Sequence, residues 1–213
     1  TADAEAALEA LFAELAGAEA ETGQRFVAHG GKMVGVLVSA NGVVLRAFSG
    51  ALGSELALPG WAPPLLDHSA IAASEAQTLQ AIRQLSVAIA EGEGASEPTT
   101  TRELKRQRQA ISAALQREIH AATWLVGPGG DRRALPEVFD APGIPTGAGD
   151  CCAPKLLSWA NSLGLAPIGL VEAFWNPGRA GYWPHGARVA ACAEKCEPLL
   201  GFLLGTSEAT TDR

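Results

Sequence analysis

The stretch G-K-M-V-G-V-L-V-S-A-N-G-V-V-L-R-A-F-S-G, residues 31–50, decides the fold that this chain is expected to adopt. Apolar runs rich in β-branched residues stand on both sides of Asn41 and Gly42. Asn-Gly supplies the two positive-φ positions of a type I′ turn, and flanking runs of this kind form strands. The stretch therefore predicts an antiparallel β-hairpin.

Helical patterns surround this hairpin. Residues 3–21 predict an Ala-rich, acidic helix, because its large apolar residues recur at helical spacing. After a Pro- and Gly-rich connection over residues 53–67, two long helical patterns follow, one over residues 69–90 and one that starts in the cap region at residues 99–101. A polar break separates the two patterns, which predicts a helical hairpin inserted into the domain.

The last third of the sequence alternates between helix and strand. A helix is expected over residues 151–163, followed by an apolar strand over residues 165–175 that the turn signal N-P-G brings to an end. A final helix is expected over residues 189–204, with Pro198 kinking or splitting it. This order of elements predicts a layered α/β domain.

Composition and charge limit the functions to consider. The 213 residues are 47% hydrophobic, which is enough for a packed core, and they carry a net charge of −7. An acidic chain does not grip nucleic acid over its whole surface, because phosphate binding needs a basic face. The sequence has neither an apolar run long enough for a membrane span nor a signal peptide pattern at its start. These features predict a cytoplasmic protein without membrane contact.

The four cysteines are the residues best suited to chemistry. In a cytosolic chain, clustered cysteines bind metal more often than they form disulfides. Cys192 and Cys196 stand four residues apart, and on a helix this spacing places both sulfurs on one face. Cys151 follows a Gly-rich loop at a predicted helix start, where backbone N–H groups favour the thiolate that metals require. The sequence therefore predicts one zinc ion bound by Cys151, Cys192 and Cys196.

The fourth ligand decides what such a site does. His185, seven residues before Cys192, would complete a closed structural site, whereas a water in its place would leave the open position that catalysis needs. Cys152 is expected to point away from its neighbour Cys151. An alternative without metal is that Cys152 and Cys192 are small core residues, since free cysteine is among the most buried residue types.

The predicted order of a hairpin, a helix beginning with a zinc ligand, a strand and paired cysteines resembles the zinc-dependent nucleobase deaminase fold, in particular its bacterial toxin branches. In that family a glutamate two residues after the first ligand moves protons while zinc activates water. Here Ala153 stands at that position when counting starts from Cys151, and Pro154 when it starts from Cys152. The paired cysteines are also spaced C-x-x-x-C rather than C-x-x-C.

Two carboxylates are candidates for the missing catalytic acid and base. Glu172 belongs to the strand that follows the Cys151 helix, and Asp150 directly precedes Cys151. Each also has an ordinary structural interpretation. Glu172 would be a strand-end carboxylate paired with a nearby base, and Asp150 would be the N-cap of the Cys151 helix.

A second resemblance covers most of the chain. The runs that carry it are G-K-M-V-G-V-L-V (31–38), A-F-S-G (47–50), W-A-P-P-L-L-D (61–67), G-A-G-D-C-C-A-P-K-L-L (147–157) and C-A-E-K-C-E-P-L-L (192–200). In this order they resemble the N-terminal extension of RluA-type pseudouridine synthases, which implies a role in RNA modification. The R-L-D motif that holds the catalytic aspartate of those synthases does not occur in the sequence, so pseudouridine formation is not assigned to these residues. We expect either a part cut ahead of a synthase domain or a free-standing relative.

Two sets of side chains are candidate RNA contacts. The first is a basic group on the second long helix: Arg102, Lys105, Arg106 and Arg108. The alternative for this group is a solvated helix face. The second is an aromatic group around the turn before the last helix: Trp175, Tyr182 and Trp183. These rings would stack on an unpaired base, or alternatively cover a small core.

These features predict an α/β, deaminase-like three-layer domain with a β-hairpin, zinc-binding helices and a helical-hairpin insertion. The core is expected to take residues 1–68 and 123–205, the insertion residues 69–122 and a tail residues 206–213. The expected function is a zinc-binding accessory domain that recognises rRNA or tRNA beside a pseudouridine synthase domain. The alternative is a zinc-dependent cytosine or adenine deaminase, free-standing or toxin-like. The helical hairpin is a candidate surface for a homodimer.

Overall fold

The computed structural model describes residues 1–24, 26–27, 30–94, 98–178 and 181–206. The chain divides into two compact units. Unit 1 takes residues 1–65, residues 125–133 and the described residues from 137 onward, and unit 2 takes residues 66–124 and 134–136. The expected tail, residues 206–213, falls outside the described residues apart from Thr206.

A three-stranded antiparallel sheet forms the centre of unit 1, with the strand order β2-β1-β5. β1 (Lys32–Ser39) and β2 (Val44–Phe48) pair with each other, which confirms the predicted hairpin. β5 (Pro167–Trp175) pairs with the other edge of β1, so β1 is the central strand. The strand predicted from the last third of the sequence therefore completes the sheet that the hairpin begins.

The hairpin turn differs from the expected one. The Gly42 N–H donates to the Ser39 carbonyl at 2.9 Å, and the Ser39 N–H donates to the Val43 carbonyl at 2.9 Å. The connection therefore has three residues, Ala40 to Gly42, and its last residue, Gly42, has a φ of 82°. A three-residue hairpin with glycine in the left-handed region is the next commonest solution after the two-residue type I′ turn, so the turn type expected from Asn-Gly is wrong although the hairpin is right.

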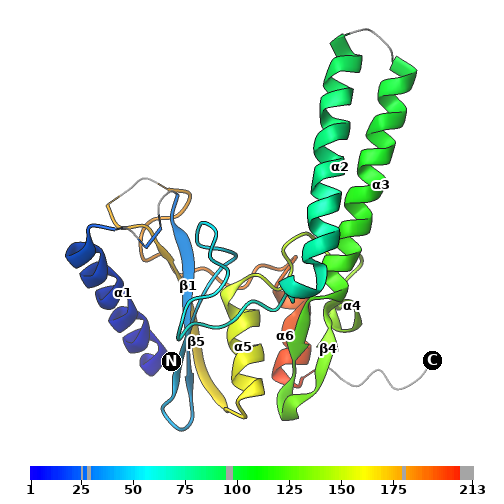
Figure 1. The fold of residues 1–213 in the computed structure, drawn as a ribbon. Coiled ribbons are helices and arrows are strands. Elements are labelled where there is room, and N and C mark those ends of the chain that lie inside the picture. The colour runs from blue at the N-terminus through cyan, green and yellow to red at the C-terminus, as the bar shows by residue number, and fades with distance from the viewer. Residues whose placement is uncertain (25, 28–29, 95–97, 179–180, 207–213) are drawn as a thin grey trace. The chain divides into compact units, whose positions relative to one another are not determined.

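Helices cover both faces of this sheet (Figure 1). α1 (Ala2–Thr22) packs on one face, where Leu8, Leu11 and Leu15 join the strand residues of the main hydrophobic core. α5 (Cys152–Ser162) packs on the other face, and α6 (Glu197–Leu204) packs against α5. Unit 1 is thus a three-layer α/β/α arrangement, because each face of the sheet must be shielded from water by a helix.

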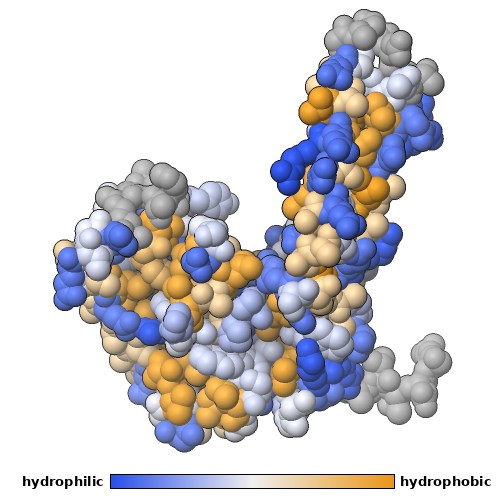
Figure 2. Space-filling model, in the orientation of Figure 1, coloured by the Kyte–Doolittle hydropathy of each residue, from blue (hydrophilic) through white to orange (hydrophobic). Residues whose placement is uncertain are grey.

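Unit 2 consists mainly of the predicted helical hairpin. α2 (His68–Gly94) and α3 (Pro98–Ala121) lie side by side along their lengths (Figure 1). Figure 2 shows hydrophilic and hydrophobic residues mixed on the visible face of these two helices, and Leu79 and Val87 are 40% and 58% exposed. No helix among the described residues is long and apolar enough to cross a membrane.

Short elements that the sequence did not predict follow α3. β3 (Trp124–Val126) and β4 (Arg132–Ala134) form a two-stranded sheet, with a 3-10 turn at Pro128–Gly130 between them. α4 (Leu135–Val138) follows directly. These strands have three residues each, too few for a period-2 pattern to be distinguished from chance.

Candidate metal centre

Cys151 occupies the N-cap position of α5. Its backbone is extended, with φ −73° and ψ 164°, and its side chain makes no capping hydrogen bond, so the thiol is left for other partners. Asp150 was the residue expected at the cap, and this expectation is wrong because the helix begins one residue later. The N-terminal end of a helix favours a negatively charged group, so the position suits a thiolate.

Cys192 and Cys196 lie in a turn directly before α6. The Cys196 N–H donates to the Cys192 carbonyl at 3.1 Å, which closes one turn of chain with the spacing of an α-helix. The helix expected from residue 189 is wrong, because α6 begins only at Glu197 and Pro198 belongs to its first turn. Proline lacks an N–H and has a φ suited to the start of a helix, which explains this boundary.

The structure brings Cys151, Cys192 and Cys196 together. Their three sulfur atoms lie within 4.8 Å of one another, and those of Cys192 and Cys196 are 3.5 Å apart. Among the described residues, no other group of His, Cys, Asp or Glu side chains has three ligand atoms so close. A disulfide sets its sulfurs about 2.05 Å apart, and all four cysteines of the chain are free thiols.

The spacing of these sulfurs fits a metal ion. Zinc–thiolate bonds of about 2.3 Å in a tetrahedral arrangement put the sulfurs roughly 3.8 Å from one another. The sulfurs of Cys192 and Cys196 are 3.5 Å apart, slightly closer than this value. All three sulfurs lie within 4.8 Å of one another, which is at most about 1 Å wider. Cys196 is buried, Cys151 is half-buried and Cys192 is exposed, so the cluster opens towards solvent on one side. The three cysteines are therefore close enough to hold a metal ion.

The thiols of Cys151 and Cys196 shift each other's pKa in opposite directions. Hydrogen bonding from Cys196 lowers the pKa of Cys151, although burial and the nearby carboxylates of Glu172 and Asp150 oppose this effect. The same hydrogen bond to Cys151, together with burial, raises the pKa of Cys196. Cys151 is thus the more acidic of these two thiols. A cation is needed to stabilise all three thiolates at once.

Cys152 is separate from the cluster, as expected from its place beside Cys151. Its sulfur donates weakly to the carbonyl oxygens of Met33 on β1 at 3.5 Å and of Ala47 on β2 at 3.6 Å. Complete burial raises the pKa of this thiol well above its usual value. Cys152 therefore packs α5 against the sheet as a small apolar residue.

Glu172 reaches the start of α5 from the neighbouring strand. Its Oε1 accepts a hydrogen bond from the Ala153 N–H at 2.6 Å, one of the N–H groups that has no partner within the helix. Burial raises the pKa of Glu172, and the hydrogen bond from Ala153 opposes this shift. The carboxylate also acts electrostatically on Cys151. Of the two catalytic candidates, Glu172 is the partly buried one, whereas Asp150 is exposed.

His185 lies apart from the cysteine cluster. Its Nδ1 accepts a hydrogen bond from the Asn176 N–H at 3.0 Å, and its ring stacks on Phe12 of α1 with centroids 5.1 Å apart. These contacts place it at the edge of the core on the α1 face of the sheet. No described His, Cys, Asp or Glu side chain joins the three sulfurs as a fourth member of the cluster.

The aromatic RNA candidates divide into two kinds. Trp175 is 2% exposed and its Nε1 donates to Glu19 at 3.2 Å, so it is a core residue and the expectation that it stacks on a base is wrong. Tyr182 and Trp183 are 87% and 40% exposed and form an edge-to-face pair with centroids 5.1 Å apart. Of the three candidate rings, Tyr182 and Trp183 are presented to solvent and Trp175 is not.

The basic RNA candidates all lie on α3 in unit 2. Arg102, Lys105 and Arg106 are exposed, and Arg106 pairs with Glu103 three residues earlier on the same helix. Arg108 is half-buried and donates to Ser86 of α2 at 3.3 Å. Arg108 therefore ties the two helices together, and the exposed group is reduced to the first three.

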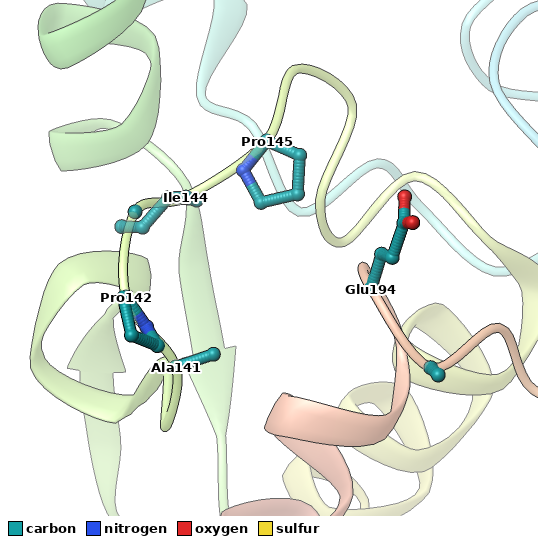
Figure 3. Close-up of a pocket in the computed structure, with 7 residues that line it drawn as sticks. Ala141, Pro142, Ile144, Pro145 and Glu194 are labelled. Carbon is teal, nitrogen blue, oxygen red and sulfur yellow. The ribbon is translucent and has the colours of Figure 1, made fainter.

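A cavity that the sequence did not indicate adjoins the cysteine turn (Figure 3). Its volume is about 400 Å³, and its lining comes from residues 141–145 and from Ala193 and Glu194, which directly follow Cys192. The walls are mostly apolar, with the Glu194 carboxylate as the one charged group among the lining residues. The signal that was available is the run A-P-G-I-P at residues 141–145, whose prolines and glycine prevent regular structure.

Two lysines near the cluster were also missed from the sequence. Lys155 is 2% exposed, and its Nζ donates to the carbonyl oxygens of Phe48 at 3.0 Å and Gly50 at 3.2 Å. Lys32 donates to the Ala51 carbonyl at 2.7 Å. The available signal for Lys155 is a single charged residue inside the apolar helical run A-P-K-L-L.

Comparison of the chain with models of known protein families, with curated proteins and with solved structures found no match.

Proposed function

We propose that this chain is a zinc-dependent domain of the nucleobase deaminase type, with the metal on Cys151, Cys192 and Cys196 and with Glu172 as the group that transfers protons. The observation that carries the proposal is the hydrogen bond of 2.6 Å between the Glu172 carboxylate and the Ala153 N–H. Ala153 is the residue at which the deaminase resemblance expects a glutamate. The Glu172 carboxylate, which comes from β5, therefore contacts the backbone of Ala153, the position that lacks the glutamate side chain of the deaminases.

The donor set supports zinc as the metal. Three thiolates are soft ligands of the kind that zinc takes in proteins, and their spacing suits a tetrahedral ion. The described residues supply no fourth His, Cys, Asp or Glu to this cluster, so one place of a tetrahedral ion is left for water. When bound, zinc would supply a Lewis acid that makes such a water acidic near neutral pH.

The roles of the protein's own groups follow from their positions. One carboxylate oxygen of Glu172 is held by the Ala153 N–H, which fixes the carboxylate at the start of α5. The other oxygen is the one to accept a proton from the attacking water and to return it to the departing amino nitrogen. In the overall reaction water adds to a ring carbon that bears an amino group, the carbon–nitrogen bond breaks, and ammonia leaves as a carbonyl forms.

The order of elements agrees with this proposal. A helix, a hairpin, a helix that begins at the first ligand, a strand beside the hairpin and then the paired cysteines follow one another in unit 1. The hairpin and β5 form one antiparallel sheet with α1 and α5 on opposite faces. This order of helix, hairpin, ligand-bearing helix, strand and paired cysteines is the one that resembles the deaminase fold.

Ammonia release tests the proposal. The zinc-loaded protein is incubated with cytosine, adenine, their nucleosides and single-stranded oligonucleotides, and released ammonia is measured. Replacing Glu172→Gln is expected to reduce the rate by about 10²- to 10⁴-fold, because the amide does not accept the proton. Zinc content should not change. Glu197→Gln, an exposed carboxylate one residue after Cys196, is the matched control and should keep full activity. No ammonia from any of these substrates would contradict deaminase chemistry.

A second candidate is a zinc-binding accessory domain for RNA pseudouridylation that does no chemistry itself. One observation favours it: the two runs that supply all three sulfurs, residues 147–157 and 192–200, belong to the resemblance to the pseudouridine synthase extension. In this case zinc would fix the start of α5 and the turn before α6, and the exposed Tyr182 and Trp183 would contact rRNA or tRNA.

Binding measurements separate this candidate from the first. Under the accessory-domain proposal, the protein should retain a labelled structured RNA in a mobility-shift assay at low salt and release it as salt is raised. The double replacement Tyr182→Ala and Trp183→Ala should weaken binding by about 10-fold or more, because stacking on each base contributes roughly 1–3 kcal/mol. Replacing the exposed basic residues Arg102 and Lys105 by Gln tests α3 in the same assay. An RNA affinity unaffected by all four changes would contradict RNA recognition by these surfaces.

A further inference from the structure

Lys155 is an unusual residue in the middle of an apolar helix face. Its side chain is among the largest fully buried ones of the chain, and the ammonium lies 5.1 Å from the centre of the Phe48 ring. A buried ammonium is costly unless hydrogen bonds and negative charges compensate for the lost water. Two carbonyl oxygens, those of Phe48 and Gly50, supply part of this compensation.

The segment from Phe48 to Ala51 links both lysines to Cys151. Lys155 binds the carbonyls of Phe48 and Gly50, and Lys32 binds that of Ala51. The Gly50 N–H in turn donates to the carbonyl of Asp150 at 2.9 Å, one residue before Cys151. The two ammonium groups therefore fix the 48–51 segment by hydrogen bonds. This segment in turn fixes the backbone next to Cys151, the first ligand.

The charge of Lys155 also suits the cluster. Three thiolates bound to a divalent ion keep a net negative charge, and the carboxylates of Glu172 and Asp150 beside Cys151 add to it. Lys155 interacts favourably with Asp150 and Cys151. Its buried ammonium therefore compensates part of this negative charge.

We propose that Lys155, assisted by Lys32, is a positioning residue of the metal centre: it fixes the backbone before Cys151 and supplies the positive charge that lets three thiolates bind a divalent cation. This inference rests on the metal site of the proposed function, and it does not depend on which reaction, if any, the site performs. It assigns a role to a lysine that touches neither the metal ligands' sulfurs nor a substrate.

Metal affinity measures this role. Lys155→Met removes the charge and nearly preserves the volume, and Lys32→Met does the same at a half-buried position. The affinity of the folded protein for zinc is measured in competition with a chromophoric chelator, and thiolate coordination is measured from the charge-transfer band of bound cobalt. Each variant is expected to bind zinc roughly 10- to 100-fold more weakly, as is typical when a group that supports the ligands is lost. A lysine with only a structural role would lower the unfolding temperature and leave the affinity and the cobalt band unchanged.

Arg83→Met is the control, because it removes an exposed positive charge of α2 whose side chain donates to the Leu79 carbonyl of its own helix and not to the 48–51 segment. Its zinc affinity should stay within about threefold of that of the unmodified protein. If Lys155→Met does not fold, as judged by circular dichroism, Lys32→Met decides the question. Folded variants of Lys155 and Lys32 that bind zinc as tightly as the unmodified protein would overturn the inference. An unmodified protein that binds no zinc would instead overturn the proposed function on which it rests.

Discussion

At the scale of residues, the adjacent cysteines Cys151 and Cys152 show how one position along the chain separates two roles. Cys151 lies at the N-cap of α5 with its thiol among those of Cys192 and Cys196. Cys152 begins the helix and turns its thiol to carbonyls of β1 and β2. Successive helical residues point about 100° apart, so only one of the pair can face the cluster. This division was predictable from the sequence.

Gly35 on β1 permits the close approach of α5 to the sheet. A Cβ atom at this position would lie 2.9 Å from the Cβ of Cys152 and 3.2 Å from the Cγ of Glu172. Both neighbours adjoin the metal centre, since Cys152 follows the first ligand and Glu172 is the proposed proton carrier. The absence of a side chain at Gly35 is therefore a condition for the geometry of the metal centre.

Gly35→Ala is expected to destabilise the protein by about 1–3 kcal/mol, because the added methyl group overpacks the interface between α5 and β1. It should also weaken zinc binding by displacing the start of α5. Denaturant-induced unfolding and the zinc titration measure the two effects. Gly17→Ala in α1 is the control: its Cβ would meet nothing within 4 Å, and the change should stabilise the helix by about 0.5–1 kcal/mol. Equal stability of Gly35→Ala and the unmodified protein would contradict the packing argument.

At the scale of elements, long periodic segments were predictable and short ones were not. α1, α2, α3, α5 and the strands of the sheet follow from the spacing of their apolar residues. The final helix was overestimated because residues 189–196 are apolar enough to continue a helical pattern, while Pro198 fixes the start of α6 close to itself. The strands β3 and β4 depend on pairing with each other, which no local pattern of three residues encodes.

In the candidate site too, the contacts set by local sequence spacing were predictable, and those set by the assembled sheet were not. The nearness of Cys192 and Cys196 was predictable because four-residue spacing brings two side chains together in any single helical turn, with or without a helix to continue it. The contact between Glu172 and Ala153 was not, since it depends on how β5 pairs with β1. The register that sets Glu172 opposite Gly35 is a property of the assembled sheet. Lys155 was missed for the same reason, because its partners lie on the segment after β2.

At the scale of the whole molecule, charge favours a local rather than a general contact with nucleic acid. The chain has a net charge of −7, and four basic side chains of α3 are exposed, those of Arg102, Lys105, Arg106 and Arg117. A small substrate bound next to the cysteines does not depend on a basic surface, and the cavity beside Cys192 has mostly apolar walls and one carboxylate. The distribution of charge thus agrees better with chemistry on a base than with a broad RNA interface.

The metal content of protein purified without chelators, measured together with the absorption spectrum after cobalt replacement, tests the three-cysteine centre most directly. We expect one equivalent of zinc, intense thiolate-to-cobalt bands at one equivalent of cobalt, and a shift of these bands when azide occupies the position left for water. Protein that is folded but holds no stoichiometric metal, and that gives no thiolate-to-cobalt band, would contradict the metal centre, and a cobalt spectrum that azide does not change would contradict its open position.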